Sequence, residues 1–525
     1  MISENLLKTT QGVKWEKIGI DKRAGVLFPL FSVRSKKSIG VGDFEDLKLI
    51  IDFCVETGNS ILQILPLNEM SYNFCPYDAI SSFAIEPLYI YLPMDSDNIP
   101  GEIQTYTNFD IVKEEKTKKL KIDFESGTWD TNSEFQKFIE ENSYWLYDFA
   151  LYKTLKDFFK NKSWEQWDKE YIEKEPHTLN LFRKIHAKEI FFYIWVQWQI
   201  YKQLKEVKQY AEEKGVFVMG DIPILVSRDS ADVWAWREFF NLEYASGAPP
   251  DMYSKIGQRW GMPTNNWDNI EKDNYRYIKE KLRYAENFYD IIRIDHVVGL
   301  FRIWSIPFNE SLKNGGLKGF FIPQDENLWE SHGRKLLKVM AENTNMLLCA
   351  EDLGVIPVFC PKVLEEFGIP GTDVFRWTKH WETTGKFFKP DEYRYTGIST
   401  LSTHDTSNWK SWWDNEAEKM EKKEIIEIFD IRKEIEKKAD KKILKDALKY
   451  SFSTRSVFSI QSIFDLLGLS DILKGDSSIW RINTPGTISN KNWTITIPVY
   501  IENILENSVC KEIKELINKA NRLCQ

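Results

Sequence analysis

The chain lacks several features that mark whole classes of protein. Its six cysteines are scattered without a CxxC spacing, which argues against a zinc site and against a disulfide framework. The longest apolar stretch, residues 190–201, contains Gln197 and Gln199 and is too short to span a bilayer, so we interpret it as a buried helix. Residues 1–20 lack the apolar core of a signal peptide. We therefore expect a cytoplasmic protein that is not inserted in a membrane.

The chain also lacks an excess of positive charge. Seventy Lys and Arg residues face 79 Asp and Glu residues, which gives a formal net charge of -9. Nucleic-acid binding requires a basic face, so we do not expect nucleic acid as a partner. The chain also has no GxGxxG after a predicted strand and no phosphate loop, which argues against a nucleotide-binding, open doubly wound sheet.

What recurs along the chain is a short apolar run that ends in polar residues and is followed by a helical pattern. The runs lie at residues 25–30, 61–65, 216–221, 291–295, 346–351, 373–376, 397–403 and 457–460. After the first run, Asp43 is a plausible N-cap for a helix over residues 44–57, and Gly58 is well placed to end it. Eight strands separated by helices predict an α/β fold, a (β/α)8 TIM barrel in which residues 1–525 form a single catalytic domain. An open doubly wound sheet is the alternative.

Three stretches do not fit the barrel repeat. Residues 95–214 contain helices dense in Trp, Tyr and Phe, which predict an inserted subdomain over the carboxyl-terminal face of the sheet. Residues 241–267 are rich in Gly, Pro and aromatic residues, as expected for an active-site loop. Residues 416–449 are crowded with Lys and Glu at helical spacing and predict a charged helical insertion. After them, an apolar stripe from Leu505 to Ala520 predicts a terminal amphipathic helix that docks on the barrel.

Candidate catalytic residues begin with Arg293 and Asp295, at the end of a predicted buried strand. Side chains alternate along a strand, so these two should point the same way while Ile294 packs on the opposite side. A guanidinium beside a carboxylate favours the ionised acid, which is the form that a carboxylate nucleophile needs. The alternative is a purely structural ion pair.

Two further acids end predicted strands, and active sites of such barrels lie at the carboxyl ends of the strands. Glu351 closes an apolar run, so burial should raise the pKa of its carboxyl, which suits a general acid. Asp405 follows His404 at the end of another predicted strand. A helix N-cap is an alternative for both acids, a buried ion pair is another for Glu351, and His404 alone is more often a satisfied histidine. A proton-donating acid paired with an ionised one is what cleavage of a glycosidic bond requires.

These residues resemble those of the amylomaltases, or 4-α-glucanotransferases, which are relatives of the α-amylases. The resemblance runs through nearly the whole chain and is carried by ordered motifs at residues 220–223, 247–251, 257–261, 293–296, 350–354, 403–405 and 481–487, with Asn492 and Trp493. Residues 301–307 are similar to the plant cytosolic and related bacterial branch of the family.

The resemblance implies roles for individual residues. Asp295 would be the nucleophile, Glu351 the acid/base, and Asp405 the acid that binds hydroxyls of the distorted sugar. The implied substrate-binding residues are Arg293, His296, His404 and Asp221 near the cleavage point, Tyr77 as a stacking residue on the donor side, and Asp251, Tyr253 and Trp260 in an aromatic loop over the groove. Plain loop packing is the alternative for Tyr253 and Trp260.

The predicted function is therefore that of a 4-α-glucanotransferase. By resemblance, it would transfer α-1,4-glucan segments from maltose or malto-oligosaccharide donors to the 4-hydroxyl of glucose or glucan acceptors, by retaining double displacement. No metal and no organic cofactor are implied. The alternatives are an amylase-like α-1,4-glucan hydrolase and a catalytically silent glucan-binding protein.

Overall fold

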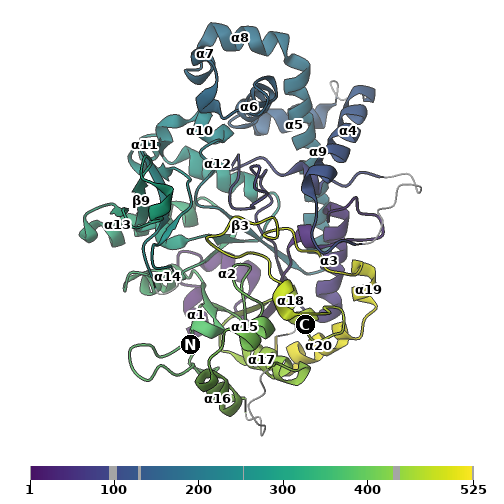
Figure 1. Cartoon of the computed structure of the whole chain (residues 1–525), viewed down its shortest axis with the longest axis vertical. Coiled ribbons are helices and arrows are strands. Elements are labelled where there is room, and N and C mark those ends of the chain that lie inside the picture. Colours follow the sequence, from purple (N-terminus) through teal and green to yellow (C-terminus); the bar gives the residue numbers. More distant parts are fainter. Residues whose placement is uncertain (1, 94–102, 128–131, 252–253, 430–437, 523–525) are drawn as a thin grey trace.

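Parallel strands at the centre of the molecule form a barrel with helices packed around it (Figure 1). The computed structural model describes residues 2–93, 103–127, 132–251, 254–429 and 438–522. Within these residues the barrel strands are β1 (Arg23–Leu27), β2 (Ile61–Gln63), β3 (Phe217–Ile222), β8 (Ile291–Ile294), β11 (Leu347–Ala350), β12 (Gly371–Val374), β13 (Gly397–Thr400) and β14 (Phe458–Ser462). Each overlaps one of the strands predicted from the sequence.

The order of the strands shows that the sheet closes on itself. The hydrogen-bonded order is β11-β8-β3-β2-β1-β14-β13-β12. Barrel strands that are adjacent in the sheet are therefore also consecutive along the chain, and the first of them, β1, pairs with the last, β14. The two end strands also lie side by side, because the backbone N–H of Ala350 donates to the Pro370 carbonyl at 2.8 Å and Thr372 Oγ1 donates to the Ala350 carbonyl at 2.9 Å. The (β/α)8 barrel is thereby confirmed over the open doubly wound alternative.

The first barrel helix, α3 (Phe44–Thr57), shows how closely local sequence fixes an element. Its N-cap Asp43 accepts hydrogen bonds from the backbone N–H groups of Glu45 and Asp46, and Asp46 bonds back to the Asp43 N–H as a capping box. Gly58 ends the helix in the left-handed conformation, with φ of 77°. Both predicted helix ends are confirmed.

Apart from the helices between β2 and β3, the other helices lie around the barrel (Figure 1). They are α1 (Ile2–Leu6), α2 (Gly12–Ile18), α10 (Ala231–Ala235), α11 (Trp267–Lys272), α12 (Arg276–Ala285), α13 (Trp329–Glu342), α14 (Cys360–Phe367), α15 (Trp409–Asn415), α16 (Lys419–Ile428), α17 (Lys441–Ser453), α18 (Ile463–Leu467), α19 (Ile501–Leu505) and α20 (Val509–Lys519). Helix α16 lies within residues 416–449, the predicted charged insertion, and α17 begins there and ends beyond it at Ser453. Val509, Ile513 and Leu516 of the stripe predicted near the carboxyl end are buried in α20, which packs on α3 and α17. Its two ends, Leu505 in α19 and Ala520 after α20, are half-buried. Among the described residues, no helix is both long enough and apolar enough to cross a bilayer.

A helical lobe between β2 and β3 rises from one end of the barrel (Figure 1). It comprises α4 (Phe109–Ser126), α5 (Ser133–Glu141), α6 (Leu146–Phe158), α7 (Lys169–Ile172), α8 (Pro176–Ile185) and α9 (Ala187–Glu213). Helix α9 packs against α6 in the lobe and against α3 of the barrel, and it leads directly into β3. The predicted insertion therefore shares its last helix with the barrel, and the apolar stretch at 190–201 lies in that helix.

Residues 241–267 are not only a loop. They contain β5 (Tyr244–Ala248), β6 (Gln258–Arg259) and β7 (Thr264–Asn265), of which β7 pairs with β4 (Phe240–Asn241). Strands β5 and β6 join β9 (Ile303–Pro307) and β10 (Phe320–Ile322) in a small antiparallel sheet with the order β10-β9-β5-β6. The sequence did not predict this sheet, because β6 and β10 have only two and three residues, while Gly247 in β5 and Pro307 in β9 interrupt the usual strand pattern.

Candidate active site

The carboxyl ends of the barrel strands open into a large groove. Its volume is about 2930 Å³, whereas pockets for single small molecules usually have about 300–1,000 Å³. The groove therefore has room for a chain-like ligand of several units. The predicted site residues that line it are Tyr77, Asp251, Trp260, Arg293, Asp295, His296, Glu351, His404 and Asp405. Tyr253 lies outside the described residues.

Strand β8 delivers Arg293 and Asp295 to the groove as its alternation predicts. Arg293 Nη1 lies 3.0 Å from Asp295 Oδ1, and Ile294 is buried on the opposite side. The Asp295 side chain keeps 25 % of its surface exposed, whereas Arg293 keeps 10 %. The ion pair considered from the sequence is thus present, and it stands at the floor of a groove with the carboxylate open to a ligand.

Asp221, at the end of β3, lies beneath the groove and not on its wall. Its side chain is fully buried, and Arg293 Nη1 lies 2.8 and 2.7 Å from its two oxygens. The Tyr77 hydroxyl also donates to Asp221, at 2.7 Å. Burial raises the pKa of Asp221, and the Arg293 guanidinium opposes that rise. A Cβ at the preceding Gly220 would lie 2.6 Å from the Tyr289 ring, so glycine allows the close packing at this point of β3.

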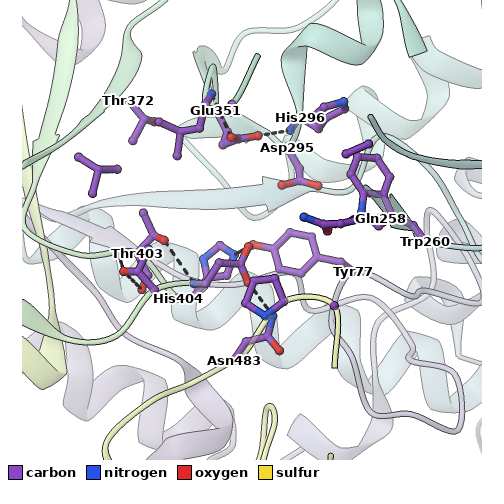
Figure 2. A pocket seen from close by; sticks show the side chains of 18 of the residues that line it. Tyr77, Gln258, Trp260, Asp295, His296, Glu351, Thr372, Thr403, His404 and Asn483 are labelled. Atoms are coloured by element: carbon purple, nitrogen blue, oxygen red, sulfur yellow. Dashed lines mark hydrogen bonds and ion pairs between the residues drawn. The ribbon is translucent and has the colours of Figure 1, made fainter. Parts of the chain in front are cut away.

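Glu351 follows β11 and is held by two backbone donors. The His296 N–H donates to Oε2 at 2.8 Å, and the Leu353 N–H donates to Oε1 at 3.1 Å. Burial raises the pKa of the Glu351 carboxyl to about 7, with Arg293 opposing the rise and the Asp295 carboxylate adding to it. The direction is the one predicted from the sequence. Figure 2 shows Glu351 and Asp295 along the same side of the cavity.

His404 lies on the other side of the cavity (Figure 2), and Asp405 follows it in the chain, after β13. Asn483 Nδ2 donates to Asp405 Oδ1 at 2.7 Å, and His404 Nε2 lies 3.4 Å from Oδ2. The Asp405 side chain is 47 % exposed, and its partial desolvation in the groove would by itself raise the pKa, but His404 and the hydrogen bond from Asn483 lower the pKa to about 2. Asp405 is therefore an ionised acceptor at neutral pH.

Neither Glu351 nor Asp405 is the N-cap residue of a helix in the described part of the chain. The helices that follow them, α14 and α15, have Phe359 and Asn408 as their N-cap residues. Both acids face the groove instead.

Aromatic rings flank the acids. Tyr77 stacks on His404 with ring centroids 5.1 Å apart, and Trp493 lies 5.7 Å from Tyr77. On the side of Asp295, Trp260 meets the His296 ring edge to face at 4.9 Å, and its Nε1 donates to Gln258 Oε1 at 3.1 Å. These rings form apolar surfaces against which a sugar face can pack.

Asp251 and Asn483 also line the groove. Asp251 caps a turn, where its carboxylate accepts from the Ser254 N–H at 2.6 Å. Asn483 was not singled out from the sequence, although it lies in the motif at 481–487, because nothing local links it to an acid 78 positions earlier. The described residues contain no cluster of three or more His, Cys, Asp or Glu side chains that could hold a metal ion.

Known proteins match this chain over most of its length. The sequence model of a family described as 4-alpha-glucanotransferase matches residues 28–500. A 4-alpha-glucanotransferase of Chlamydia pneumoniae is 34% identical over 521 residues, covering 95% of this chain and 97% of the relative. A rice (Oryza sativa) 4-alpha-glucanotransferase is 26% identical over 668 residues, covering 95% of this chain and 70% of the relative, in agreement with the plant likeness seen in the sequence.

A solved structure agrees with these sequence matches. The amylomaltase from Streptococcus agalactiae in complex with acarbose superposes with a TM-score of 0.82 at 26% identity, covering 96% of this chain and 100% of that one. The barrel, the acids gathered at its mouth and these matches lead to one conclusion: the chain belongs to the 4-alpha-glucanotransferase (amylomaltase) family.

Proposed function

We propose that this protein transfers segments of α-1,4-glucan from maltose or a malto-oligosaccharide to the 4-hydroxyl of glucose or of another glucan, by retaining double displacement. The observation that carries the proposal is the pairing of two differently tuned carboxyls in one groove. Asp295 is ion-paired with Arg293, and Glu351 beside it has a pKa of about 7. One acid is thus supplied with a cation and the other keeps its proton near neutral pH.

In the first step Asp295 attacks the anomeric carbon of the donor while the Glu351 carboxyl gives its proton to the glycosidic oxygen. The bond between the anomeric carbon and that oxygen breaks, the shorter glucan leaves with its new hydroxyl, and a covalent β-glycosyl ester forms on Asp295. Glu351 is left as a carboxylate. Its two backbone donors, from His296 and Leu353, then stabilise the negative charge.

In the second step the Glu351 carboxylate takes the proton from the 4-hydroxyl of an acceptor sugar. The acceptor oxygen attacks the anomeric carbon and displaces Asp295, which restores the α-linkage and both catalytic groups. We assign to Asp405 the binding of hydroxyls on the sugar at the cleavage point, because it is ionised and fixed by Asn483. Tyr77 would stack on that sugar, next to His404.

The buried contacts of Asp221 suggest a positioning role in this reaction. Its buried carboxylate balances the charge of Arg293 and accepts a hydrogen bond from the Tyr77 hydroxyl, so it fixes the positions of both side chains at the floor of the groove. His296 and the loop residues Asp251, Tyr253 and Trp260 would contact and cover the glucan. A cytoplasmic location stays a prediction from the sequence.

Transfer exceeds hydrolysis only if a second sugar reaches the glycosyl-enzyme ahead of water. Trp260 lines the groove and packs on His296, the residue after Asp295, and we assign to its ring the exclusion of water from this side of the groove. Incubation with pure maltotriose tests the proposal. A ladder of longer oligomers together with glucose is the expected result, whereas shorter products alone would identify an amylase-like hydrolase.

The same assay separates an enzyme from a silent binding protein. The parent protein should turn over maltotriose, and Asp295→Asn should lose turnover while it still binds the oligosaccharide. A parent protein that binds maltotriose without converting it would contradict the proposal.

A further inference from the structure

We propose that Trp381 is a stacking platform for a glucosyl unit of a longer α-1,4-glucan, at a subsite of the groove away from the cleavage point. The inference rests on the proposed function, since it extends the same groove toward longer substrates. Trp381 lies between β12 and β13, on the far side of the barrel mouth from β2 and the Tyr77 loop.

The exposure of Trp381 is unusual for this protein. Its side chain keeps 57 % of its surface exposed, whereas the other tryptophans in the described part of the chain are buried or half-buried. Trp381 also lines the groove that contains Asp295 and Glu351. A large apolar ring left open inside a ligand groove is a common feature of sites that bind flat, partly apolar faces.

The ring is held in place by the hairpin that carries it. The backbone N–H of His380 donates to the Lys386 carbonyl at 2.9 Å, and that of Phe388 donates to the Thr378 carbonyl at 3.1 Å. The indole Nε1 of Trp381 donates to the Trp377 carbonyl at 2.8 Å. The polar edge of the ring is thereby satisfied within the protein, and what remains exposed is apolar. A fixed ring loses little conformational entropy when a ligand packs on it.

Lys379 supports the ring from one side. Its Nζ lies 5.0 Å from the centroid of the Trp381 ring and 4.3 Å from that of Phe387. The ammonium is 2.5 Å from Glu421 Oε1, and the lysine side chain is only 8 % exposed. Because the cation occupies one face of the indole, a ligand would stack on the other face. The ligand class that fits is an uncharged sugar ring, which offers a patch of C–H groups.

The segment that carries Trp381 is tied to the strand of the general acid. Arg394, at the end of this segment, bonds to both oxygens of Asp352 at 2.6 and 2.9 Å and to Asp373 at 3.1 Å. Asp352 directly follows Glu351. Arg394 thus ties the segment after Trp381 to the residue that follows Glu351, and Trp381 and Glu351 line the same groove.

The test compares maltotriose with maltoheptaose as the sole substrate. Trp381→Ala should lower the ratio of kcat/KM for maltoheptaose to that for maltotriose about three- to tenfold, the loss of one aromatic contact. Trp381→Tyr should restore most of that ratio. Tyr147→Ala is the matched control, because Tyr147 is 44 % exposed but lies outside the groove lining, and the ratio should stay at the parent value.

Two further arms show which partner the platform holds. Maltoheptaose donor with glucose acceptor, and maltose donor with maltoheptaose acceptor, should differ in their response to Trp381→Ala. A loss in the first arm places the platform on the donor side, and a loss in the second places it on the acceptor side. An unchanged ratio in all arms, or an equal loss on maltotriose and maltoheptaose, would overturn the inference while leaving transfer activity itself established.

Binding is measured separately from turnover. Calorimetric titration of maltoheptaose into Asp295→Asn, with and without Trp381→Ala, should show a Kd that rises about three- to tenfold when the ring is removed. If the parent protein does not transfer but this difference in Kd is present, the proposed function fails and the platform stands. Equal Kd values in the two proteins would remove the platform.

Discussion

The backbone N–H of His296 donates a 2.8 Å hydrogen bond to Glu351 Oε2, so the residue after the proposed nucleophile holds the proposed general acid. His296 adopts the left-handed region, with φ of 45°, at the turn that ends β8. A reciprocal bond runs from the Glu351 N–H to the Ile294 carbonyl at 3.0 Å. Strands β8 and β11 therefore place the two carboxyls as one unit, before any substrate binds.

The pKa of Glu351 predicts how the activity depends on pH. The general acid must be protonated to donate, and burial raises the pKa of Glu351 to about 7. Accordingly, kcat/KM for maltotriose should be constant just below that pKa and should fall about tenfold per pH unit above it. With an α-glycosyl fluoride donor, whose leaving group needs no proton, this alkaline decline should vanish from the glycosylation step. A profile that stays flat to pH 9 with maltotriose would contradict the assignment of Glu351.

Asp221→Asn should destabilise the protein, because it leaves the buried Arg293 guanidinium with less compensating charge. Removing one partner of a buried ion pair costs several kcal/mol, and we expect about 3 kcal/mol because Asp295 still pairs with Arg293. Urea unfolding followed by circular dichroism measures the loss. Glu366→Gln is the control, because Glu366 pairs with Arg334 at 2.7 Å at the surface and should cost about 0–1 kcal/mol. Equal losses in the two variants would show that Asp221 is not a special support.

Asn483→Ala should lower kcat and leave folding intact. Without the 2.7 Å hydrogen bond from Asn483, Asp405 loses its fixed orientation, and a misplaced group in an active site can cost about 100-fold in rate. We expect kcat to fall about 10- to 100-fold while KM changes much less. Ser489→Ala, in the same loop, is the control: among the described residues the Ser489 hydroxyl accepts only from the Lys491 N–H, so this variant should behave as the parent protein. A variant with parent-like kcat would show that Asp405 needs no support from Asn483.

Trp260→Ala should shift the products from transfer toward hydrolysis. The indole packs on His296 next to Asp295, so its loss gives water a path to the glycosyl-enzyme. The ratio of hydrolysis to transfer, measured from new reducing ends and from the oligomer ladder, should rise about tenfold. Trp267→Ala is the matched control, since that ring packs near His332 and does not line the groove. If both variants keep the parent ratio, the aromatic cover is not what favours transfer.

The barrel and the position of the three acids at its mouth were predictable from the sequence because their signals are local. Strand β8 is a continuous buried run that ends in charged residues, and all four of its residues are buried. The Asp43 side chain caps the first turn of α3, and Gly58 ends the helix in the left-handed conformation. Both effects are confined to one turn of the helix. The resemblance to a known family then supplied roles that spacing alone could not assign.

The rest depends on contacts between distant segments. In the antiparallel sheet of β5, β6, β9 and β10, strands β6 and β10 have only two and three residues, and pairing with β5 and β9 stabilises them. The bond from Asn483 to Asp405 and the bond from Tyr77 to Asp221 join residues 78 and 144 positions apart. Pairwise contacts of this kind leave no trace in the local pattern of either partner, so a single sequence does not reveal them.

The central claim is that Asp295 carries the glucan between donor and acceptor. Glu351→Gln treated with α-maltosyl fluoride tests it most directly, because the fluoride leaves without a proton while the second step lacks its base. Rapid quenching, intact mass measurement and peptide mapping should show one maltosyl group on the peptide that contains Asp295, and none in the Asp295→Asn/Glu351→Gln double variant. An adduct on another residue, or the absence of an adduct while fluoride is released, would contradict the account.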